Sequence, residues 1–210
     1  MAITLSLIVL ILSVVVHEVS HGYAADALGD PTARLSGRLT LNPLPHIDLM
    51  GSILIPALLI FSGSSVLFGW AKPVPYNPYN LKNRRWGEAF VALAGSASNL
   101  FLAVVFGLIV HFGAAFFSPQ ALSVAATITF VNLFLGLFNL IPFPPLDGYT
   151  ALRAALPWSF AARLGAFEQR IRSTGLLALI FFLFFFSLLL AGPFFKLVVW
   201  LFSLLTGTPA

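Results

Sequence analysis

The stretch ITLSLIVLILSVVVHEVSH, residues 3–21, decides the fold because it runs from an apolar helix directly into a pattern of ionisable side chains. Residues 3–16 carry no charge, and their only polar side chains are Thr4, Ser6 and Ser13. At about 1.5 Å per residue, the histidine that follows lies roughly 24 Å along the helix, inside a hydrocarbon layer about 30 Å thick. Ionisable groups at that depth are costly, so they indicate a functional site that faces a helix bundle or a water-filled cavity.

The motif itself is HEVSH, residues 17–21. His17 and His21 lie on one helical face, since positions i and i+4 are separated by only about 40° around the helix axis. Glu18 points about 100° to the side, where it can bind a water molecule beside the metal rather than the metal itself. The spacing therefore predicts a zinc site with its own general base. The alternative is a set of polar side chains that join membrane helices through hydrogen bonds.

The composition is that of a polytopic membrane protein. Of the 210 residues, 59% are hydrophobic and 9% are charged, and the mean hydropathy is +0.97. These values exclude a soluble domain. The net charge of +4 comes from Lys and Arg in the loops, which suits an anionic membrane face rather than a nucleic acid. The chain contains no Cys, so nitrogen and oxygen atoms must hold any zinc.

We expect one domain, residues 1–210, with an all-α fold of about four to six membrane helices around a buried zinc site. The predicted spans are residues 2–25, 88–112, 121–141 and 174–191. Alternating polar and apolar side chains in residues 33–41 predict a short β-hairpin after the first helix. Residues 149–172 contain four arginines and Glu168, and this pattern predicts a helix lying at the membrane interface.

The apolar segment 49–68 has two interpretations. Gly51, Pro56 and the run SGSS at 62–65 interrupt it, and each is a weak point in a straight helix. The segment either crosses the membrane or enters it and returns to the same side as a re-entrant loop.

A catalytic zinc has three protein ligands and one open position, so the chain must supply a third ligand. The best candidate is Asp147 within NLIPFPPLDG at 139–148, where the prolines end a span and can turn a carboxylate back toward the bundle. A simple helix stop with an Asp-Gly turn explains the same residues. His46 and Asp48 are competing donors, and His46 can also contact a water or the substrate.

Several motifs together resemble those of the site-2 proteases, the intramembrane zinc metalloproteases of bacteria, archaea and eukaryotes. They are HEVSH at 17–21, GRLTLNP at 37–43, GWAKPVP at 69–75, GSASN at 95–99 and the Asn-Pro-Asp-Gly element at 139–148. The resemblance covers nearly the whole chain, and the pattern is that of compact bacterial members without a PDZ or CBS module. It implies one zinc per chain held by His17, His21 and Asp147, with catalysis by Glu18.

The resemblance also implies that Asn99 and Asn139 lie close to the substrate or the transition state. Either amide could donate a hydrogen bond to the oxyanion. Packing of a small-residue helix contact explains GSASN at 95–99 equally well.

The three proposed ligands must lie at one depth in the membrane. His17, His21 and Asp147 are all near the C-terminal ends of their helices, so these two helices should run in the same direction. That requires residues 49–68 to return without crossing. This topology puts ten of the eleven Lys and Arg residues on one side, which the positive-inside rule makes cytoplasmic. With the resemblance to bacterial members, we expect an integral protein of the bacterial inner membrane.

The function that follows is that of a zinc-dependent intramembrane endopeptidase, which cleaves transmembrane segments of substrate proteins with metal-activated water in regulated intramembrane proteolysis. Glu18 would take the proton from that water. A helical substrate must first unwind, and one way is to add a strand to the predicted hairpin. The expected partners are transmembrane protein substrates and the lipid bilayer, with no nucleic acid.

One alternative is a membrane metal-ion binding or transport protein that uses the same His and Asp cluster. Another is a proteolytically inactive binder of membrane helices, against which the intact Glu18 argues.

Overall fold

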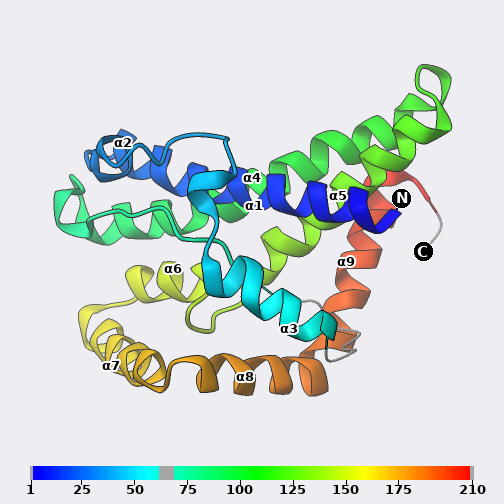
Figure 1. Ribbon diagram of the computed structural model, residues 1–210. Coiled ribbons are helices and arrows are strands. Elements are labelled where there is room, and N and C mark those ends of the chain that lie inside the picture. Colours follow the sequence, from blue (N-terminus) through cyan, green and yellow to red (C-terminus); the bar gives the residue numbers. More distant parts are fainter. Residues whose placement is uncertain (1, 62–68, 209–210) are drawn as a thin grey trace.

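The computed structural model describes residues 2–61 and 69–208, and every regular element in this part of the chain is helical (Figure 1). The α-helices are α1 (Ala2–Ala27), α2 (Thr32–Leu35), α3 (Ile55–Phe61), α4 (Arg84–Phe112), α5 (Pro119–Asn139), α6 (Asp147–Ala155), α7 (Trp158–Thr174), α8 (Leu176–Phe185) and α9 (Ala191–Thr206). Shorter elements are 3₁₀ turns at Leu44–His46, Pro78–Asn80 and Gly113–Ala115 and π-helical turns at Leu49–Leu54 and Phe186–Leu190.

Four helical stretches are long and apolar enough to cross a membrane: Thr4–Ala27, Arg84–Ala115, Pro119–Asn139 and Ile180–Thr206. They confirm the prediction of an all-α membrane protein, at the lower end of the expected number of helices within the residues described. The fourth stretch combines α8 and α9. The helix type changes at Leu190, and Pro193, which has no N–H to donate, lies in the first turn of α9.

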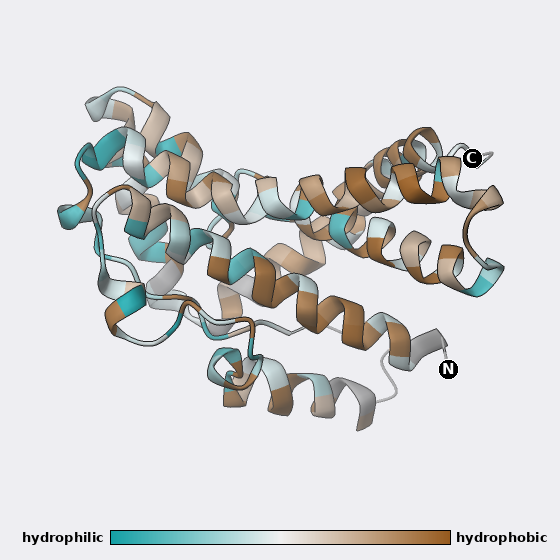
Figure 2. Ribbon diagram, turned by 90° about the horizontal axis from the view of Figure 1, so that it is seen from above, coloured by the Kyte–Doolittle hydropathy of each residue, from teal (hydrophilic) through white to brown (hydrophobic). Residues whose placement is uncertain are grey.

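Helices α1, α4 and α5 form the bundle that positions the site, with α4 antiparallel to both of its neighbours (Figure 1). Small side chains let the backbones approach closely. A Cβ on Gly136 of α5 would lie 2.9 Å from Leu100 of α4, and Ala103 of α4 is fully buried. Hydrophilic residues gather at the end of the bundle opposite both termini (Figure 2). The molecule therefore has one polar end, at which α2 and α7 lie.

Helices α8 and α9 pack on α5 through phenylalanine side chains. The ring of Phe138 lies 6.0 Å from Phe182 of α8 and 6.2 Å from Phe194 of α9, measured between ring centroids, and both partners are buried. The opposite face of α8 exposes Phe181, Phe184 and Phe185. One face of α8 thus joins the core, and the other presents the apolar surface of a lipid-facing helix.

The predicted β-hairpin at residues 33–41 is wrong. The chain forms α2 there, and Gly37 then turns it with a φ of +65°. In a strand, residues i and i+2 would share a face, yet Ala33 is fully buried and Leu35 is 80% exposed. Arg38 donates to the Lys72 carbonyl over 2.8 Å. This segment is therefore held by a distant loop rather than by a partner strand.

Residues 51 and 52, near the start of segment 49–68, contact residue 70, which lies just beyond it. The Trp70 N–H donates to the Gly51 carbonyl over 3.1 Å, and the Ser52 hydroxyl donates to the Trp70 carbonyl over 2.8 Å. The helical part from Leu49 to Phe61 consists of a six-residue π-helical turn followed by the seven residues of α3. At about 1.5 Å per residue it is roughly 20 Å long, which is shorter than the hydrocarbon layer. The predicted break at 62–65 lies outside the described residues.

Candidate metal centre

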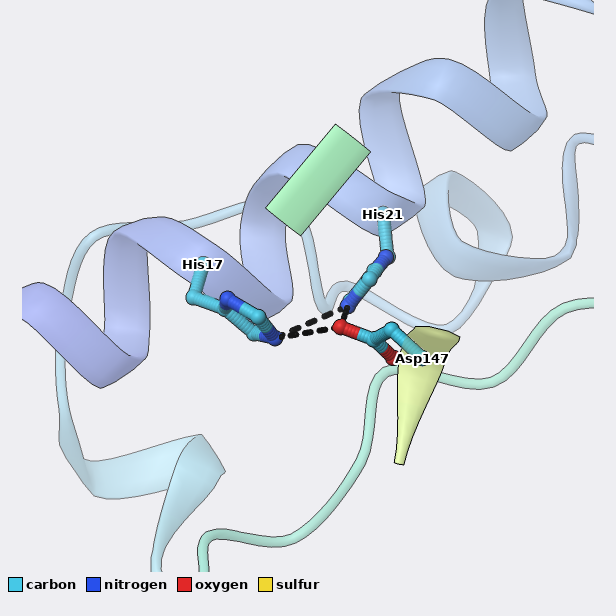
Figure 3. Close-up of side chains that lie close together, drawn as sticks. All are labelled: His17, His21 and Asp147. Carbon is cyan, nitrogen blue, oxygen red and sulfur yellow. Dashed lines mark hydrogen bonds and ion pairs between the residues drawn. The ribbon is translucent and has the colours of Figure 1, made fainter. Parts of the chain in front are cut away.

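Three side chains from two helices converge on one point. His17 and His21 project from α1, and Asp147 is the first residue of α6 (Figure 3). Asp147 Oδ2 lies 3.0 Å from His17 Nε2 and 3.4 Å from His21 Nε2, and the two Nε2 atoms are 3.1 Å apart. Within residues 2–61 and 69–208, this is the one group of three or more His, Asp or Glu side chains close enough to hold a metal ion.

A hydrogen bond holds Nδ1 of each imidazole, which leaves Nε2 to offer a lone pair. His21 Nδ1 lies 2.7 Å from the main-chain carbonyl of Val91, which can only accept, so Nδ1 carries the hydrogen. His17 Nδ1 lies 2.7 Å from Oδ1 of Asn99. The Asn99 amide nitrogen donates to Asn132 over 2.7 Å, so its oxygen is the acceptor and His17 Nδ1 is the donor. Both Nε2 atoms are therefore unprotonated in the neutral rings.

With both rings neutral, three electron-pair donors face one another. Asp147 Oδ2 is buried and receives no hydrogen bond. This arrangement is repulsive unless a proton or a metal ion lies among the three atoms. Zinc bonds of about 2.0–2.1 Å in a tetrahedral site separate neighbouring ligand atoms by roughly 3.3 Å. The distances of 3.0, 3.1 and 3.4 Å agree with that value, so the residues fit a zinc with one open position.

Gly95 of α4 makes the room for this cluster. A Cβ atom at this position would lie 2.5 Å from His21 Nε2 and 2.7 Å from His17 Nε2. Any side chain here would enter the space between the imidazoles that a metal ion needs. Asn99, one helical turn later, is the acceptor for His17. The motif GSASN at 95–99 therefore contributes to the site as well as to helix packing.

Asp147 reaches the histidines because the chain turns back sharply after α5. Pro142, Pro144 and Pro145 lie in the loop that follows α5. Gly148 packs so tightly on the end of α5 that a Cβ would overlap the Leu140 carbonyl. Only glycine permits this approach, and it carries the neighbouring Asp147 toward α1.

Helix α6 is nine residues long and is clamped by its neighbours. Arg153 forms one ion pair with Glu88 of α4 and another, over 2.7 Å, with Glu168 of α7. Arg85 of α4 donates to the Ala154 carbonyl over 2.9 Å, which satisfies part of the C-terminus of α6. The position of Asp147 therefore depends on contacts made up to two turns away along its helix.

Glu18 faces the loop that precedes α4. Its Oε2 accepts a hydrogen bond from the Val74 N–H over 2.9 Å. Its Oε1 accepts none within the described chain, and the side chain is partly exposed. One carboxylate oxygen is thus fixed, and the other is free to bind a water.

The other predicted residues lie outside the ligand cluster. The Asn139 amide donates over 3.0 Å to a carbonyl of its own helix one turn earlier. His46 is buried, and its Nε2 lies 3.0 Å from the Thr40 carbonyl. Asp48 caps the π-helical turn that follows it. Neither competing donor, His46 nor Asp48, is brought to the metal centre.

Sequence reasoning missed Asn132. Its amide donates over 2.9 Å to the Ser13 hydroxyl and accepts from Asn99, so α1, α4 and α5 share one buried hydrogen-bond network beside His17. An Asn in the middle of an apolar span was the available signal, because such a residue needs a partner in the bundle.

Comparison with known proteins identifies the family. The family model of Peptidase family M50 matches residues 111–186, which contain Asp147. "Putative zinc metalloprotease YwhC" of Bacillus subtilis (strain 168) is 40% identical over 169 residues, 77% of this chain and 74% of the relative. "Putative zinc metalloprotease Rip2" of Mycobacterium tuberculosis (strain ATCC 25618 / H37Rv) is 34% identical over 198 residues, 92% of this chain and 71% of the relative. The chain belongs to peptidase family M50, the site-2 protease family.

Membership of peptidase family M50 confirms the resemblance found in the motifs. It makes the protein a metallopeptidase, a hydrolase of peptide bonds. The four apolar helices and the site-2 protease family together make it an integral membrane protein. Zinc is the metal in the names of both relatives, and the two imidazoles and one carboxylate are a donor set suited to it. No solved structure matches the chain at a significant level.

Proposed function

We propose that this protein is a zinc-dependent intramembrane endopeptidase that cleaves transmembrane segments of substrate proteins. The observation that carries the proposal is the set of three ligand atoms, 3.0–3.4 Å apart, from α6 and from α1, the helix that also carries Glu18. The family and the four apolar helices support cleavage inside the membrane.

In this proposal, His17, His21 and Asp147 hold the zinc, and hydrogen-bond acceptors on α4 orient the two imidazoles. When bound, zinc supplies Lewis acidity, which lowers the pKa of a water molecule and polarises the scissile carbonyl. Glu18 takes a proton from the water as its oxygen adds to the carbonyl carbon. It then delivers that proton to the leaving nitrogen.

The two asparagines take different roles. Both amide hydrogens of Asn99 are used, since its nitrogen donates to the Ser13 carbonyl and to Asn132. We therefore assign Asn99 to the orientation of His17 rather than to the oxyanion. Asn139 has a second amide hydrogen to offer a substrate carbonyl.

The proposed topology keeps segment 49–68 on one side of the membrane. The contact between Gly51 and Trp70 supports a re-entrant loop, and so does the common direction of α1 and α5 (Figure 1). Helix α7 exposes Phe160 and Arg163, which supports an interfacial position for residues 149–172. Ten of the eleven basic residues then lie on the cytoplasmic side of a bacterial inner membrane, in a single domain of residues 1–210.

Metal content and cleavage test the proposal. We expect about one zinc per chain in detergent-purified wild type and in Glu18→Gln, and much less in Asp147→Ala. In proteoliposomes that hold a panel of tagged transmembrane segments, wild type should cleave at least one, and Glu18→Gln should cleave none. Equal zinc in wild type and Asp147→Ala would remove Asp147 as a ligand. Zinc flux without cleavage, unaffected by Glu18→Gln, would favour the transport alternative.

A further inference from the structure

The motif GWAKPVP at 69–75 has no part in the metal cluster, yet hydrogen bonds tie it to α1 and to the chain around Arg38 and His46. Residues 69–77 form no helix or strand. The Lys72 N–H donates to the His46 carbonyl over 2.8 Å, and Arg38 donates to the Lys72 carbonyl over 2.8 Å. Two residues later, the Val74 N–H donates to Glu18 over 2.9 Å. Three separate hydrogen bonds thus fix the path of this segment.

The side chain of Val74 is held as firmly as its backbone. It is 5% exposed, whereas its neighbours Pro73 and Pro75 are exposed. It packs on Gly22 of α1, where an added Cβ would lie 2.8 Å from Val74 Cγ1. Gly22 is one helical turn beyond Glu18. The bond to Glu18 therefore comes from a segment seated on α1 and not from a loosely placed loop.

We propose that the main-chain N–H of Val74 positions Glu18, and that segment 72–74 is the arm that holds this N–H in place. This proposal rests on the proposed function. A glutamate side chain has several rotatable bonds, and a hydrogen bond to its ionised form selects one rotamer. With Oε2 bound, Oε1 is left to meet a water. Arg38 and the His46 carbonyl act on Glu18 only through this arm.

The flanking prolines make the donor unambiguous. Pro73 and Pro75 have no N–H, so Val74 carries the only exchangeable main-chain hydrogen in 73–75. Their fixed φ angles also limit the backbone conformations open to this segment. A side-chain donor could rotate away from the carboxylate, but a main-chain donor in a fixed segment cannot.

Amide hydrogen exchange tests the contact without metal or substrate. In metal-free protein in detergent, the Val74 amide should exchange about tenfold more slowly in wild type than in Glu18→Ala, which has no acceptor. Glu18→Gln keeps an acceptor oxygen and should retain most of the protection. Equal exchange rates in wild type and Glu18→Ala would overturn the proposal.

A matched pair of variants tests the consequence for Glu18. Val74→Pro removes the N–H, whereas Val74→Ala keeps it and loses only side-chain packing. With cobalt in place of zinc, the probe is acetohydroxamate, which chelates the metal and donates its hydroxyl proton to the neighbouring carboxylate. We expect Val74→Pro to bind cobalt like wild type and acetohydroxamate about tenfold more weakly, as Glu18→Ala does, with Val74→Ala within twofold of wild type.

Equal acetohydroxamate affinity in the two Val74 variants would overturn the proposal. Loss of cobalt from Val74→Pro would also overturn it, because the arm would then act on the metal ligands and not through Glu18. If wild type itself binds no cobalt, the proposed function fails, and the exchange measurement still decides whether Val74 holds Glu18. That measurement also needs no substitution at position 74.

Discussion

Helices α1 and α6 supply the side chains of the candidate metal centre but hold them by different means. His17 and His21 lie on a 26-residue helix packed in the bundle, and helix periodicity alone sets their spacing. Asp147 starts a nine-residue helix whose place depends on Gly148 at one end and Arg153 at the other. A ligand pair set by local geometry should tolerate distant changes, whereas a ligand set by tertiary contacts should not.

The largest expected effect comes from filling the space that both helices share. Gly95→Ala places a Cβ 2.5 Å from His21 Nε2, so the imidazoles must move apart and zinc affinity should fall about a hundredfold or more. Gly165→Ala is the matched control, because nothing lies within 4 Å of its added Cβ. Zinc competition titrations of the two variants provide the measurement. Wild-type affinity in Gly95→Ala would mean that α4 does not border the metal.

The next effect tests the clamp on α6 directly. Arg153→Gln deprives Glu88 and Glu168 of their shared partner and should lower zinc affinity about tenfold to a hundredfold, although no ligand is changed. The exposed pair of Arg34 with Asp26 is the control, so Arg34→Gln should leave zinc affinity unchanged. If the two variants bind zinc equally well, α6 holds Asp147 without the clamp.

A smaller effect asks whether α1 also needs outside support. Asn99→Ala removes the acceptor for His17 Nδ1 and should weaken zinc binding about tenfold, because the ring is then free to turn. Asn139→Ala should leave zinc affinity unchanged, since that amide bonds only to its own helix in the described structure. An Asn99→Ala protein with wild-type zinc affinity would show that helix spacing alone orients the ring.

The smallest effect concerns the loop after α1. Burial would raise the pKa of Asp30, but hydrogen bonds from Thr32, Asn77 and Asn80 outweigh burial and lower its pKa. Because the folded pKa lies below the unfolded value of about 4, Asp30 stabilises the fold above that pH and loses this contribution as the pH falls through the folded pKa. We expect Asp30→Asn to lower the Tm by a few degrees at neutral pH and less on acidification. A Tm difference that grows with acidification would contradict this assignment. Asp26→Asn, at a half-buried position nearby, serves as the control.

Features of the fold and the site could be predicted from the sequence where they depend on residues close together in the chain. The apolar spans and the HEVSH spacing depend on neighbours within one or two turns, and the four apolar helices appear where hydropathy is high. The prediction of a hairpin at 33–41 was wrong because a short alternation of polar and apolar residues is a weak indication of a strand. In the structure, this segment is held instead by hydrogen bonds from Arg38 to the carbonyls of residues 72 and 73. His46 is a metal donor by type, but its ring is turned to the Thr40 carbonyl.

The sequence by itself determined the membrane class, the helical fold, the His pair with its neighbouring carboxylate, and Asp147 as the candidate third ligand. Only the tertiary structure decided which donors meet. Asp147 lies 126 residues after His21 in the chain, yet its oxygen is 3.4 Å from that ring. Val74 reaches Glu18 across 56 residues. Helix periodicity is a property of adjacent residues, whereas these approaches depend on the packing of whole helices, which no short stretch of sequence specifies.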